Sequence, residues 1–388
     1  MRVLHLHDRL SARGGADRHL WGVLDRLRGR VETLLAVGLD DGSLPQEERR
    51  RLGSWQRLKG LERGGWSARG GQGARQRLAR LIADFAPDAI HLHNIMDPDL
   101  LGLCAATGRA LMTVQDHRAF CPGLGKLTAA GQICRAPLGE GCLACFQEAV
   151  HGRRMLDLTR RRLETLAGMR RLLTLSSYMA GELAAAGLDP ARIVVLPPFV
   201  HGLASAPAPE PRPRTHHLLA CRLVERKGVR VALDAALMMA NPLPLVVAGD
   251  GPLAGEARRA AARTPERLRF AGWADRPAMG RLLASAASLW LPSLWAEPFG
   301  ISGLEAMALG APVAASRVGG VADWLNDGVT GLALPPGDAQ ALAAAADRLA
   351  GGEGPAMGAR AAEDVARRFA PAPLMEALLK QYGQAAWH

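Results

Sequence analysis

Two acidic side chains, Glu297 and Glu305, stand eight positions apart in the segment EPFGISGLEAMALGAPV. Small residues, among them Gly300 and Ser302, separate the two acids, and the sequence beyond Glu305 is helical. A helix N-terminus offers backbone N–H groups and a positive dipole end to an anion, and small residues let a phosphate come close. Carboxylates beside that phosphate accept hydrogen bonds from hydroxyl groups of the same ligand. A phosphate joined to polyols is a sugar nucleotide.

The same residues also allow a purely structural explanation. Ser302 and Glu305 have the S-x-x-E spacing of a capping box, in which the two side chains satisfy free N–H groups at a helix start. On this segment alone the capping box is the more common explanation. The rest of the chain has to decide between the two.

Two glycine-containing segments have the residue types of phosphate or base contacts. Gly14 and Gly15 precede an expected helix, where they either let a phosphate approach the backbone or only form a tight turn. Asp250 and Gly251 follow an apolar run, and turn formation alone explains them, although such a turn can also border a base. Each of these signals is weak by itself.

A pair of cations stands in the segment CRLVERKG, where Arg222 and Lys227 are five residues apart. An isolated surface Arg and Lys usually have no function. Beside the end of a strand and within reach of a helix N-terminus, however, they form a suitable clamp for a phosphate.

Four of the six cysteines lie close together in the sequence and end in a C-x2-C pair. A structural zinc site, an iron–sulfur cluster and reduced thiols in a packed loop all remain open for them. The spacing of the first three is irregular for a zinc ribbon, and a cytoplasmic location disfavours disulfides. The four are Cys121, Cys134, Cys142 and Cys145.

The elements that must position these residues alternate along the chain. Short apolar runs predict buried strands, and the segments between them have helical periodicity. The pattern predicts an α/β fold in which helices cover both faces of parallel sheets. The predicted strands cover residues 2–7, 33–38, 88–93, 110–116, 171–176, 193–197, 216–222, 244–250, 268–273, 288–293 and 311–316.

Two domains fit the length of 388 residues, and a Pro-rich segment separates them. Ligands of such sheets bind beyond the carboxyl ends of the strands, so a cleft between the domains is the expected site. The predicted parts are an acceptor-binding domain at 1–200 with a Cys-rich insertion at 121–145, a linker at 201–215, a donor-binding domain at 201–370, and a helix at 371–388 that crosses back to the first domain. A Gly-rich loop is expected at 60–73.

The formal net charge of +11 is concentrated in residues 1–200, which hold 29 basic and 20 acidic residues. Such an excess suggests an anionic partner, although nearly all of it is Arg and a codon bias explains it equally well. Residues 151–171 have the pattern of a basic amphipathic helix, either resting on a membrane surface or simply solvated. With two Tyr and seven Phe the chain is poor in residues that stack on bases, so nucleic acid is not expected.

The start of the sequence does not resemble a signal peptide, and no apolar run reaches the length of about 20 residues that a membrane helix needs. A cytoplasmic location is therefore expected. A peripheral contact with the inner membrane face remains an open alternative.

Taken in order and spacing, the segments resemble the retaining glycosyltransferases of family 4, the group 1 transferases, which have the GT-B fold. The resemblance covers nearly the whole chain and favours the ligand-binding interpretation of Glu297 and Glu305 over the capping box. It implies two doubly wound Rossmann-like domains that face each other across a deep cleft. The segments that carry it include RGGADRHL, DAIHLHN, LSSYMAGELAAAGLDPARIVVLPPFV, CRLVERKG, VVAGDGPL, GWADR and EPFGISGLEAMALGAPVAASRVGGVADWLNDGVTGLALPPGD.

The resemblance also implies roles for single residues. Glu305 would hold the ribose of a nucleoside diphosphate sugar, and Glu297 would contact the donor sugar. Arg222 and Lys227 would neutralise the departing diphosphate, so that the chemistry needs no metal cofactor. The remaining residues expected to bind the donor are Gly14, Gly15, Asp250, Gly251, Phe299, Gly300, Ile301 and Ser302. The D-x-D pattern at Asp97 and Asp99 is interpreted as a helix start.

One position departs from the family pattern. Many relatives have His-Asp after the strand that ends in LMTVQD, whereas here Gln115 precedes Asp116 and His117 follows. Asp116 and His117 join Glu297 as candidate catalytic residues. Either His117 replaces the family His, or Gln115 supplies only a hydrogen bond, and because a Gln cannot titrate, an acid–base role at this site is in doubt.

The predicted function is transfer of a sugar, with retention of configuration, to a hydroxyl of a saccharide or a lipid-linked acceptor. The alternatives are a non-catalytic scaffold that binds sugar nucleotides or glycans, and a phosphorylase or epimerase of the same fold.

Overall fold

The computed structural model describes residues 1–62, 64, 72–201 and 213–386. The chain divides into two compact units, which comprise residues 1–130, 134–198 and 371–388, and residues 131–133 and 199–370. Each unit contains one sheet, and every pairing between its named strands is parallel. The predicted class of two parallel-sheet, Rossmann-like domains is therefore confirmed. The predicted Gly-rich loop and linker lie largely outside the described residues.

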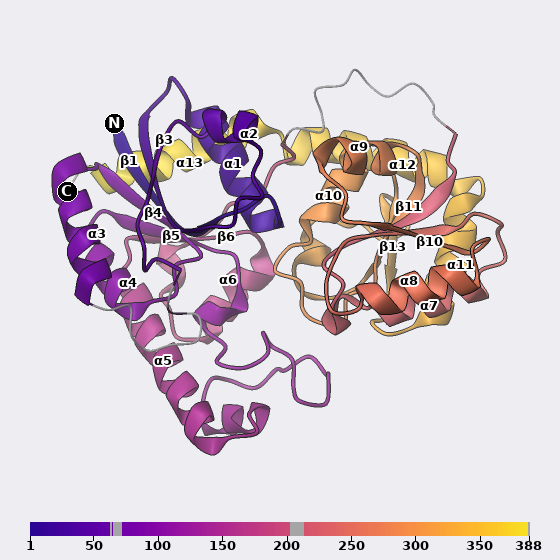
Figure 1. The fold of residues 1–388 in the computed structure, drawn as a ribbon, viewed down its shortest axis with the longest axis horizontal. Coiled ribbons are helices and arrows are strands. Elements are labelled where there is room, and N and C mark those ends of the chain that lie inside the picture. Colours follow the sequence, from indigo (N-terminus) through magenta and orange to yellow (C-terminus); the bar gives the residue numbers. More distant parts are fainter. Residues whose placement is uncertain (63, 65–71, 202–212, 387–388) are drawn as a thin grey trace. The chain divides into compact units, whose positions relative to one another are not determined.

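The sheet of the first unit has seven strands in the order β3-β2-β1-β4-β5-β6-β7 (Figure 1). From β1 the sheet extends through β2 to β3 on one side, and from β4 it extends through β5 to β7 on the other, which is the doubly wound pattern. The strands are β1 (Arg2–Leu10), β2 (Glu32–Asp40), β3 (Ser54–Arg57), β4 (Ala89–His93), β5 (Ala110–Val114), β6 (Arg171–Thr174) and β7 (Ile193–Val195). The helices are α1 (Gly15–Leu27), α2 (Gln46–Arg51), α3 (Gln72–Phe85), α4 (Pro98–Ala105), α5 (Ala149–Ala167), α6 (Ser177–Ala185) and α13 (Pro371–Ala386).

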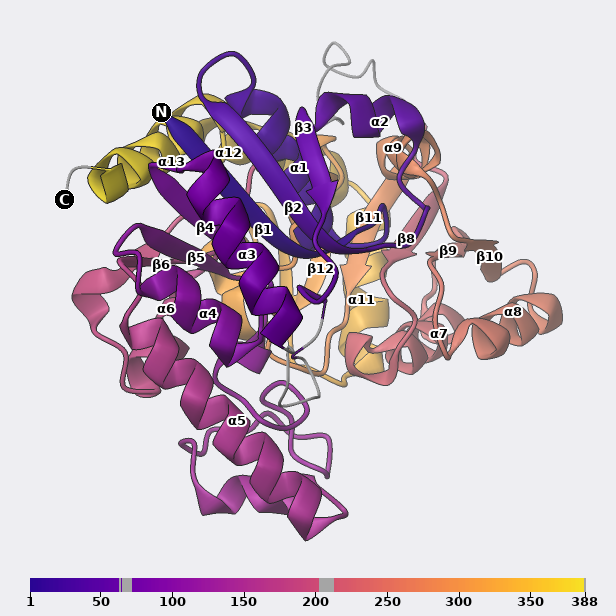
Figure 2. The ribbon, with the colours of Figure 1, turned by 60° about the vertical axis from the view of Figure 1, so that its left-hand side comes forward.

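The last helix, α13, packs against β4 in the first unit, although the whole second unit precedes it in the chain (Figures 1 and 2). The hydroxyl of its buried Tyr382 lies 2.7 Å from Nδ1 of His91. His5 is the β1 neighbour of His91, and its Nδ1 lies 3.1 Å from Nε2 of His93. Burial lowers the pKa of His5 to about 3 and those of His91 and His93 well below the usual value, so this layer under α13 consists of neutral rings.

The sheet of the second unit has six strands in the order β10-β9-β8-β11-β12-β13, and its winding reverses between β8 and β11. Buried apolar side chains of β9, β11 and β12 face the helices that cover the sheet. The strands are β8 (His216–Ala220), β9 (Leu245–Ala248), β10 (Leu268–Gly272), β11 (Ala286–Leu291), β12 (Val313–Ser316) and β13 (Gly331–Leu334). The helices are α7 (Val229–Met238), α8 (Ala254–Arg263), α9 (Arg276–Ala284), α10 (Ile301–Ala308), α11 (Ala339–Ala350) and α12 (Glu353–Arg368).

Every strand predicted from an apolar run is present, whereas β3 and β13 were not predicted. The sequence of β3 is SWQR, an edge strand with mostly exposed side chains, so it lacks the apolar signal of a buried strand. β13 is also an edge strand, but its sequence GLAL is apolar. It is short and lies between Gly- and Pro-containing turns, so it was not recognised as a strand.

The basic amphipathic helix predicted at 151–171 is α5. Its apolar side chains, Leu156, Leu163 and Leu166 among them, are buried within the first unit, and α5 packs on α4. The apolar side of this helix, which suggested a membrane contact, thus packs in the core of the first unit. The arginines of the helix lie mainly on its exposed side. Across the described chain, no helix combines the length and the apolar character that spanning a membrane requires.

Candidate functional site

The carboxyl ends of the parallel strands bring several predicted residues to one edge of the second sheet. Arg222 and Lys227 follow β8, and Asp250 and Gly251 follow β9, its neighbour in the sheet. Glu297 follows β11, which borders β8 on the other side. The point where the winding reverses, between β8 and β11, is the usual ligand site of such a sheet.

An ion pair between the partly buried Lys227 and the buried Glu297 lies at this edge. The Nζ atom of Lys227 donates to both carboxylate oxygens of Glu297, at 2.6 and 2.9 Å. Oε1 of Glu297 also accepts hydrogen bonds from the Ser293 hydroxyl and, at 2.9 Å, from Nε1 of Trp295. Burial alone would raise the pKa of Glu297, but the charge of Lys227 and these hydrogen bonds outweigh it and lower that pKa, so Glu297 is an anion.

The backbone at Gly228 makes this pairing geometrically feasible. Gly228 has a φ of +68°, and a Cβ there would lie 1.8 Å from the carbonyl oxygen of Pro292. Nearby, Leu294 N donates to the carbonyl of Arg226 at 2.9 Å. The loop that carries Lys227 is thus held directly against the loop that leads to Glu297.

Helix α10 begins at Ile301, with Gly300 at its N-cap and a φ of +91°. No side chain caps this helix, and Ser302 is its second residue rather than its cap. The capping box considered for Ser302 and Glu305 is therefore wrong, because a glycine in the left-handed region takes the cap position. The N–H of Gly303 donates to the carbonyl of Gly300 at 2.9 Å. The N–H groups of Ile301 and Ser302 are the first two of the helix, where an anion can serve as acceptor.

Trp324 supports the start of α10 from behind. Its Nε1 donates to the carbonyl of the buried Phe299 at 2.6 Å. A Cβ at Gly303 would lie 2.2 Å from Cη2 of the Trp324 ring, so only glycine fits there. Phe299 is therefore a structural neighbour of the helix start, and its side chain lies in the core.

Glu305 is held by a residue that the sequence analysis did not single out. Nη1 of Arg276, the first residue of α9, lies 2.5 Å from Oε1 of Glu305, and both side chains are largely buried. Arg222, in contrast, is exposed, and its guanidinium contacts none of the described residues through a hydrogen bond or ion pair. Arg222 and the two fixed carboxylates, Glu297 and Glu305, thus belong to segments at the carboxyl edge of the second sheet.

The Asp250–Gly251 segment forms the predicted tight turn. Oδ1 of Asp250 accepts from the backbone N of Gly251 at 2.8 Å, and its carbonyl accepts from Leu223 N at 2.8 Å. The turn is thereby joined to the segment that carries Arg222.

In the first unit, Gly14 and Gly15 lie at the start of the expected helix, α1, with Gly14 at its N-cap and Gly15 as its first residue. A Cβ at Gly14 would lie 2.3 Å from Oδ2 of Asp17. Asp17 is buried, and it accepts from Nε2 of His7 at 2.8 Å and from Nη2 of Arg9 at 2.9 Å. Burial alone would raise the pKa of Asp17, but His7 and Arg9 outweigh it and lower that pKa.

Three consecutive residues after β5, Gln115, Asp116 and His117, have different surroundings. Gln115 is buried, and neither polar atom of its side chain has a hydrogen-bond partner among the described residues. Asp116 caps a short 3-10 helix by accepting from Arg118 N at 2.8 Å. His117 is fully buried, with Nε2 3.0 Å from the Tyr178 hydroxyl. The three side chains thus differ in setting: Gln115 is a buried amide, Asp116 caps a turn, and His117 lies in the core beside Tyr178.

Two family models match the chain. Glycosyltransferase Family 4 matches residues 13–201, and Glycosyl transferases group 1 matches residues 214–351. The chain is thus a family 4-like glycosyltransferase. The predicted recognition is thus confirmed for both units.

Relatives outside the family models agree with this assignment. The phosphatidyl-myo-inositol mannosyltransferase of Mycobacterium leprae (strain TN) is 29% identical over 343 residues, which are 85% of this chain and 82% of that protein. The glycogen synthase of Mycobacterium tuberculosis (strain CDC 1551 / Oshkosh) is 37% identical over 144 residues, 34% of this chain and only 34% of that protein.

Solved structures confirm the GT-B class of fold. The Anabaena protein HepE in complex with UDP has a TM-score of 0.73 at 16% identity, and the alignment covers 99% of this chain and 100% of that chain. WaaG, a glycosyltransferase involved in lipopolysaccharide biosynthesis, has a TM-score of 0.68 at 15% identity and covers 100% of both chains.

Several residues of this family 4-like protein were missed by sequence reasoning. Ser293 and Trp295 are in S-x-W-x-E spacing with Glu297, a local signal that could have been used. Arg276, Trp324 and Asp17 gave no such signal, because their partners are distant in the sequence or look like ordinary loop residues.

The four predicted metal ligands of the family 4-like chain are partly buried free thiols. Burial and the nearby Cys121, Cys134 and Cys142 raise the pKa of Cys145. Within the described residues, potential ligand atoms of His5, His91 and His93 all lie within 4.8 Å of one another. No three of the cysteine sulfur atoms meet this criterion. Zinc binding by the cysteines therefore stays a prediction. Of the other two, Cys104 is buried and Cys221 partly buried.

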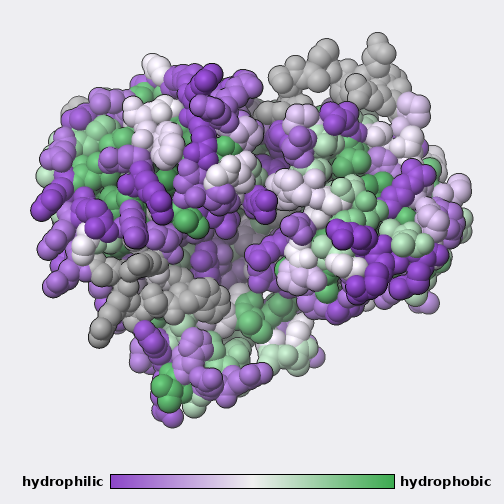
Figure 3. Space-filling model, in the orientation of Figure 1, coloured by the Kyte–Doolittle hydropathy of each residue, from purple (hydrophilic) through white to green (hydrophobic). Residues whose placement is uncertain are grey.

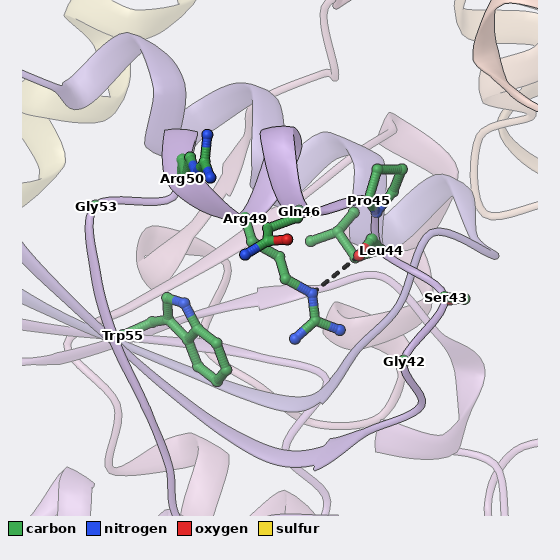
Figure 4. Close-up of a pocket in the computed structure, with 9 residues that line it drawn as sticks. All are labelled: Gly42, Ser43, Leu44, Pro45, Gln46, Arg49, Arg50, Gly53 and Trp55. Carbon is green, nitrogen blue, oxygen red and sulfur yellow. Dashed lines mark hydrogen bonds between the residues drawn. The ribbon is translucent and has the colours of Figure 1, made fainter.

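A separate pocket of about 760 Å³ lies beside α2 in the first unit (Figure 4). The guanidinium of Arg49 points toward the ring of Trp55, 5.8 Å from its centroid. Asp40 holds the same guanidinium at 2.6 and 2.7 Å, and the Leu44 carbonyl accepts from its Nε. The charge of Arg49 is thus neutralised by Asp40, and none of the predicted donor-site residues lines the pocket.

Proposed function

We propose that this chain is a retaining glycosyltransferase, which moves a sugar from a nucleoside diphosphate sugar to a hydroxyl group of a saccharide or lipid-linked acceptor. The observation that carries the proposal is the largely buried Lys227–Glu297 pair at the carboxyl edge of the second sheet. A pair of this kind is costly to build without a purpose, and here it lies in the family's E-x7-E element.

The donor would bind through charge complementarity. Arg222, Lys227 and the N–H groups of Gly300, Ile301 and Ser302 would surround the diphosphate. Glu305, with one oxygen already on Arg276, would accept from the ribose hydroxyls. In the first unit, Gly14 and Gly15 would allow the backbone to come close to the donor or the acceptor.

Transfer would need no metal ion in the reaction itself. As the bond between the anomeric carbon and the diphosphate breaks, the two cations and the start of α10 stabilise the negative charge that develops. The leaving phosphate oxygen takes the proton of the acceptor hydroxyl while that hydroxyl bonds to the same face of the sugar. Glu297 orients the sugar and stabilises positive charge at the anomeric carbon. Gln115 contributes hydrogen bonds and no proton.

The acceptor class in the proposal rests on one relative and on the charge of the chain. The mannosyltransferase relative has phosphatidyl-myo-inositol in its name, and a basic first half suits an anionic lipid-linked acceptor at a membrane surface. UDP is the first nucleotide to test, because HepE was solved in complex with it.

The test is calorimetric titration of the full chain with UDP, GDP and ADP in the presence of EDTA. One diphosphate should bind at micromolar Kd, and Arg222→Ala should weaken it by about tenfold or more, which is about 1.4 kcal/mol. Arg263→Ala, an exposed arginine at the end of α8, is the matched control and should bind normally. Failure of all three nucleotides to bind would remove the donor site from the proposal.

Turnover separates the enzyme from a non-catalytic binder, an alternative that Gln115 keeps open. With the matching donor sugar, release of the nucleotide should be measurable and should continue in EDTA. NMR of the product should show the anomeric configuration of the donor. Binding without turnover would favour the scaffold, and turnover that needs inorganic phosphate as acceptor would favour a phosphorylase.

A further inference from the structure

The segment at residues 121–148, here called the cysteine-rich lobe, joins β5 to α5 and projects with the first half of α5 away from the first sheet (Figures 1 and 2). It contains no strand and only one short 3-10 helix, at Glu140–Cys145. Pro122 and Leu127 are its buried residues. The surface view shows hydrophobic and hydrophilic side chains mixed over the part of the molecule where the lobe lies (Figure 3). A segment of this size with so little apolar core needs another source of stability, usually a metal or disulfides.

Two of the lobe's cysteines already have a chelating arrangement. Cys142 and Cys145 are three residues apart in the 3-10 helix, whose period of three residues places both side chains on the same side. The turn after Cys121 packs against them, since a Cβ at Gly123 would lie 3.0 Å from Cβ and 3.4 Å from Sγ of Cys145.

The turn after Cys121 brings in the other two cysteines. The backbone N of Lys126 donates to Sγ of Cys121 at 3.3 Å, which requires two successive left-handed residues, Gly125 at a φ of +75° and Lys126 at +62°. The carbonyl of Lys126 accepts from the backbone N of Cys134 at 2.8 Å. Cys121, Cys134 and Cys145 are therefore held around one turn, and Cys142 is on the helix that faces it.

We propose that Cys121, Cys134, Cys142 and Cys145 bind one zinc ion, which holds the cysteine-rich lobe together. Four thiolates in tetrahedral arrangement form a structural zinc site, and all four thiols lose their protons when the metal binds. The N–H of Lys126 stabilises the thiolate charge, as outer hydrogen bonds do at metal sites. No three of the four sulfur atoms, all within the described residues, lie within 4.8 Å of one another, so zinc binding would draw them together.

Metal analysis of the full chain, purified without chelator, tests the proposal directly. We expect one zinc and no iron per chain, and a loss of at least about 90% of the zinc in Cys142→Ser/Cys145→Ser. The matched control Cys104→Ser/Cys221→Ser changes the two cysteines outside the lobe and should retain its zinc. A wild-type chain without zinc contradicts the proposal, and iron with sulfide in its place identifies a cluster instead.

Two further measurements do not depend on the fold of a variant. Denaturation of the wild type with EDTA, without reductant, should release six reactive thiols, whereas two would mean that the lobe is held by disulfides. Extraction of the metal should speed tryptic cleavage after Lys126 and Arg135 by about tenfold, because cleavage follows the population of the open lobe. Unchanged cleavage would contradict the structural role. Neither measurement uses transferase activity, so both stand apart from the proposed function.

Discussion

The Nζ atom of Lys227 lies within 2.9 Å of both carboxylate oxygens of Glu297, and the two residues come from loops after neighbouring strands, 70 positions apart. Ser293 and Trp295 add hydrogen bonds to the same carboxylate. A donor would thus meet a charged group whose orientation is already set, so little reorganisation is needed when charge develops in the reaction.

We expect Glu297→Gln to lower kcat by about 100-fold or more, because Gln keeps the size of the side chain and removes its charge. Initial rates with the matching donor measure this. Glu353→Gln, which neutralises the exposed partner of Arg348, is the control and should keep the wild-type kcat. A Glu297→Gln enzyme with normal kcat contradicts a role for this carboxylate in the transition state.

Arg276→Ala should raise the donor KM by about tenfold and leave kcat within about twofold, because Arg276 orients Glu305 and does not touch the reacting atoms. Arg276→Lys restores the charge without the planar fork and should recover part of the loss. Arg281→Ala, an exposed change on the same helix, is the control.

A comparison with the 2′-deoxy donor refines this test. If Arg276 works through Glu305, removal of the ribose hydroxyl should weaken the wild type more than Arg276→Ala. An equal penalty in both proteins would mean that the ion pair is structural only.

Gly303→Ala should destabilise the second unit by about 1–3 kcal/mol, since the new methyl group would overlap the ring of Trp324. It should also weaken nucleotide binding, because the start of α10 has to move. The matched substitution Gly181→Ala lies in α6 with no atom within 4 Å of the new Cβ and should stabilise by about 0.5–1 kcal/mol. Urea unfolding measures both changes, and a neutral Gly303→Ala contradicts the packing described here.

Acidification should destabilise the first unit through His5. Its pKa is about 3 when folded and 6.5 ordinarily, so below pH 6.5 the unfolded chain binds a proton that the folded chain rejects. Stability is therefore lost as pH falls from 6.5 toward 3, by about 1.4 kcal/mol per pH unit for this residue. His5→Gln should reduce the slope of unfolding free energy against pH by that amount between pH 4 and 6. Between pH 7 and 8 the two slopes should agree.

The alternation of apolar runs and helical segments was sufficient to predict the fold, because buried parallel strands are local in sequence and nearly all apolar. The Glu297 and Glu305 element was found for the same reason, since its parts lie within nine residues. The polar edge strand β3 has no comparable signal.

The partners of the site residues were mostly not predictable. Arg276 is 29 residues from Glu305, and only the sheet topology brings α9 beside α10. The capping-box interpretation of Ser302 failed because spacing does not reveal backbone conformation, and Gly300 takes the cap with a positive φ. His117, a candidate catalytic residue, is buried beside Tyr178, a contact that no sequence pattern indicates.

The return of α13 to the first unit sets the order in which this protein can mature on the ribosome. The sheet of the first unit is synthesised early, but Tyr382, the partner of His91, follows only after residues 199–370. At translation rates of roughly 5–20 residues per second, synthesis of residues 199–370 takes on the order of ten to thirty seconds, and α13 follows only after it. During that interval residues 199–370 can fold into the second unit, whereas His91 of the first unit still lacks its partner Tyr382.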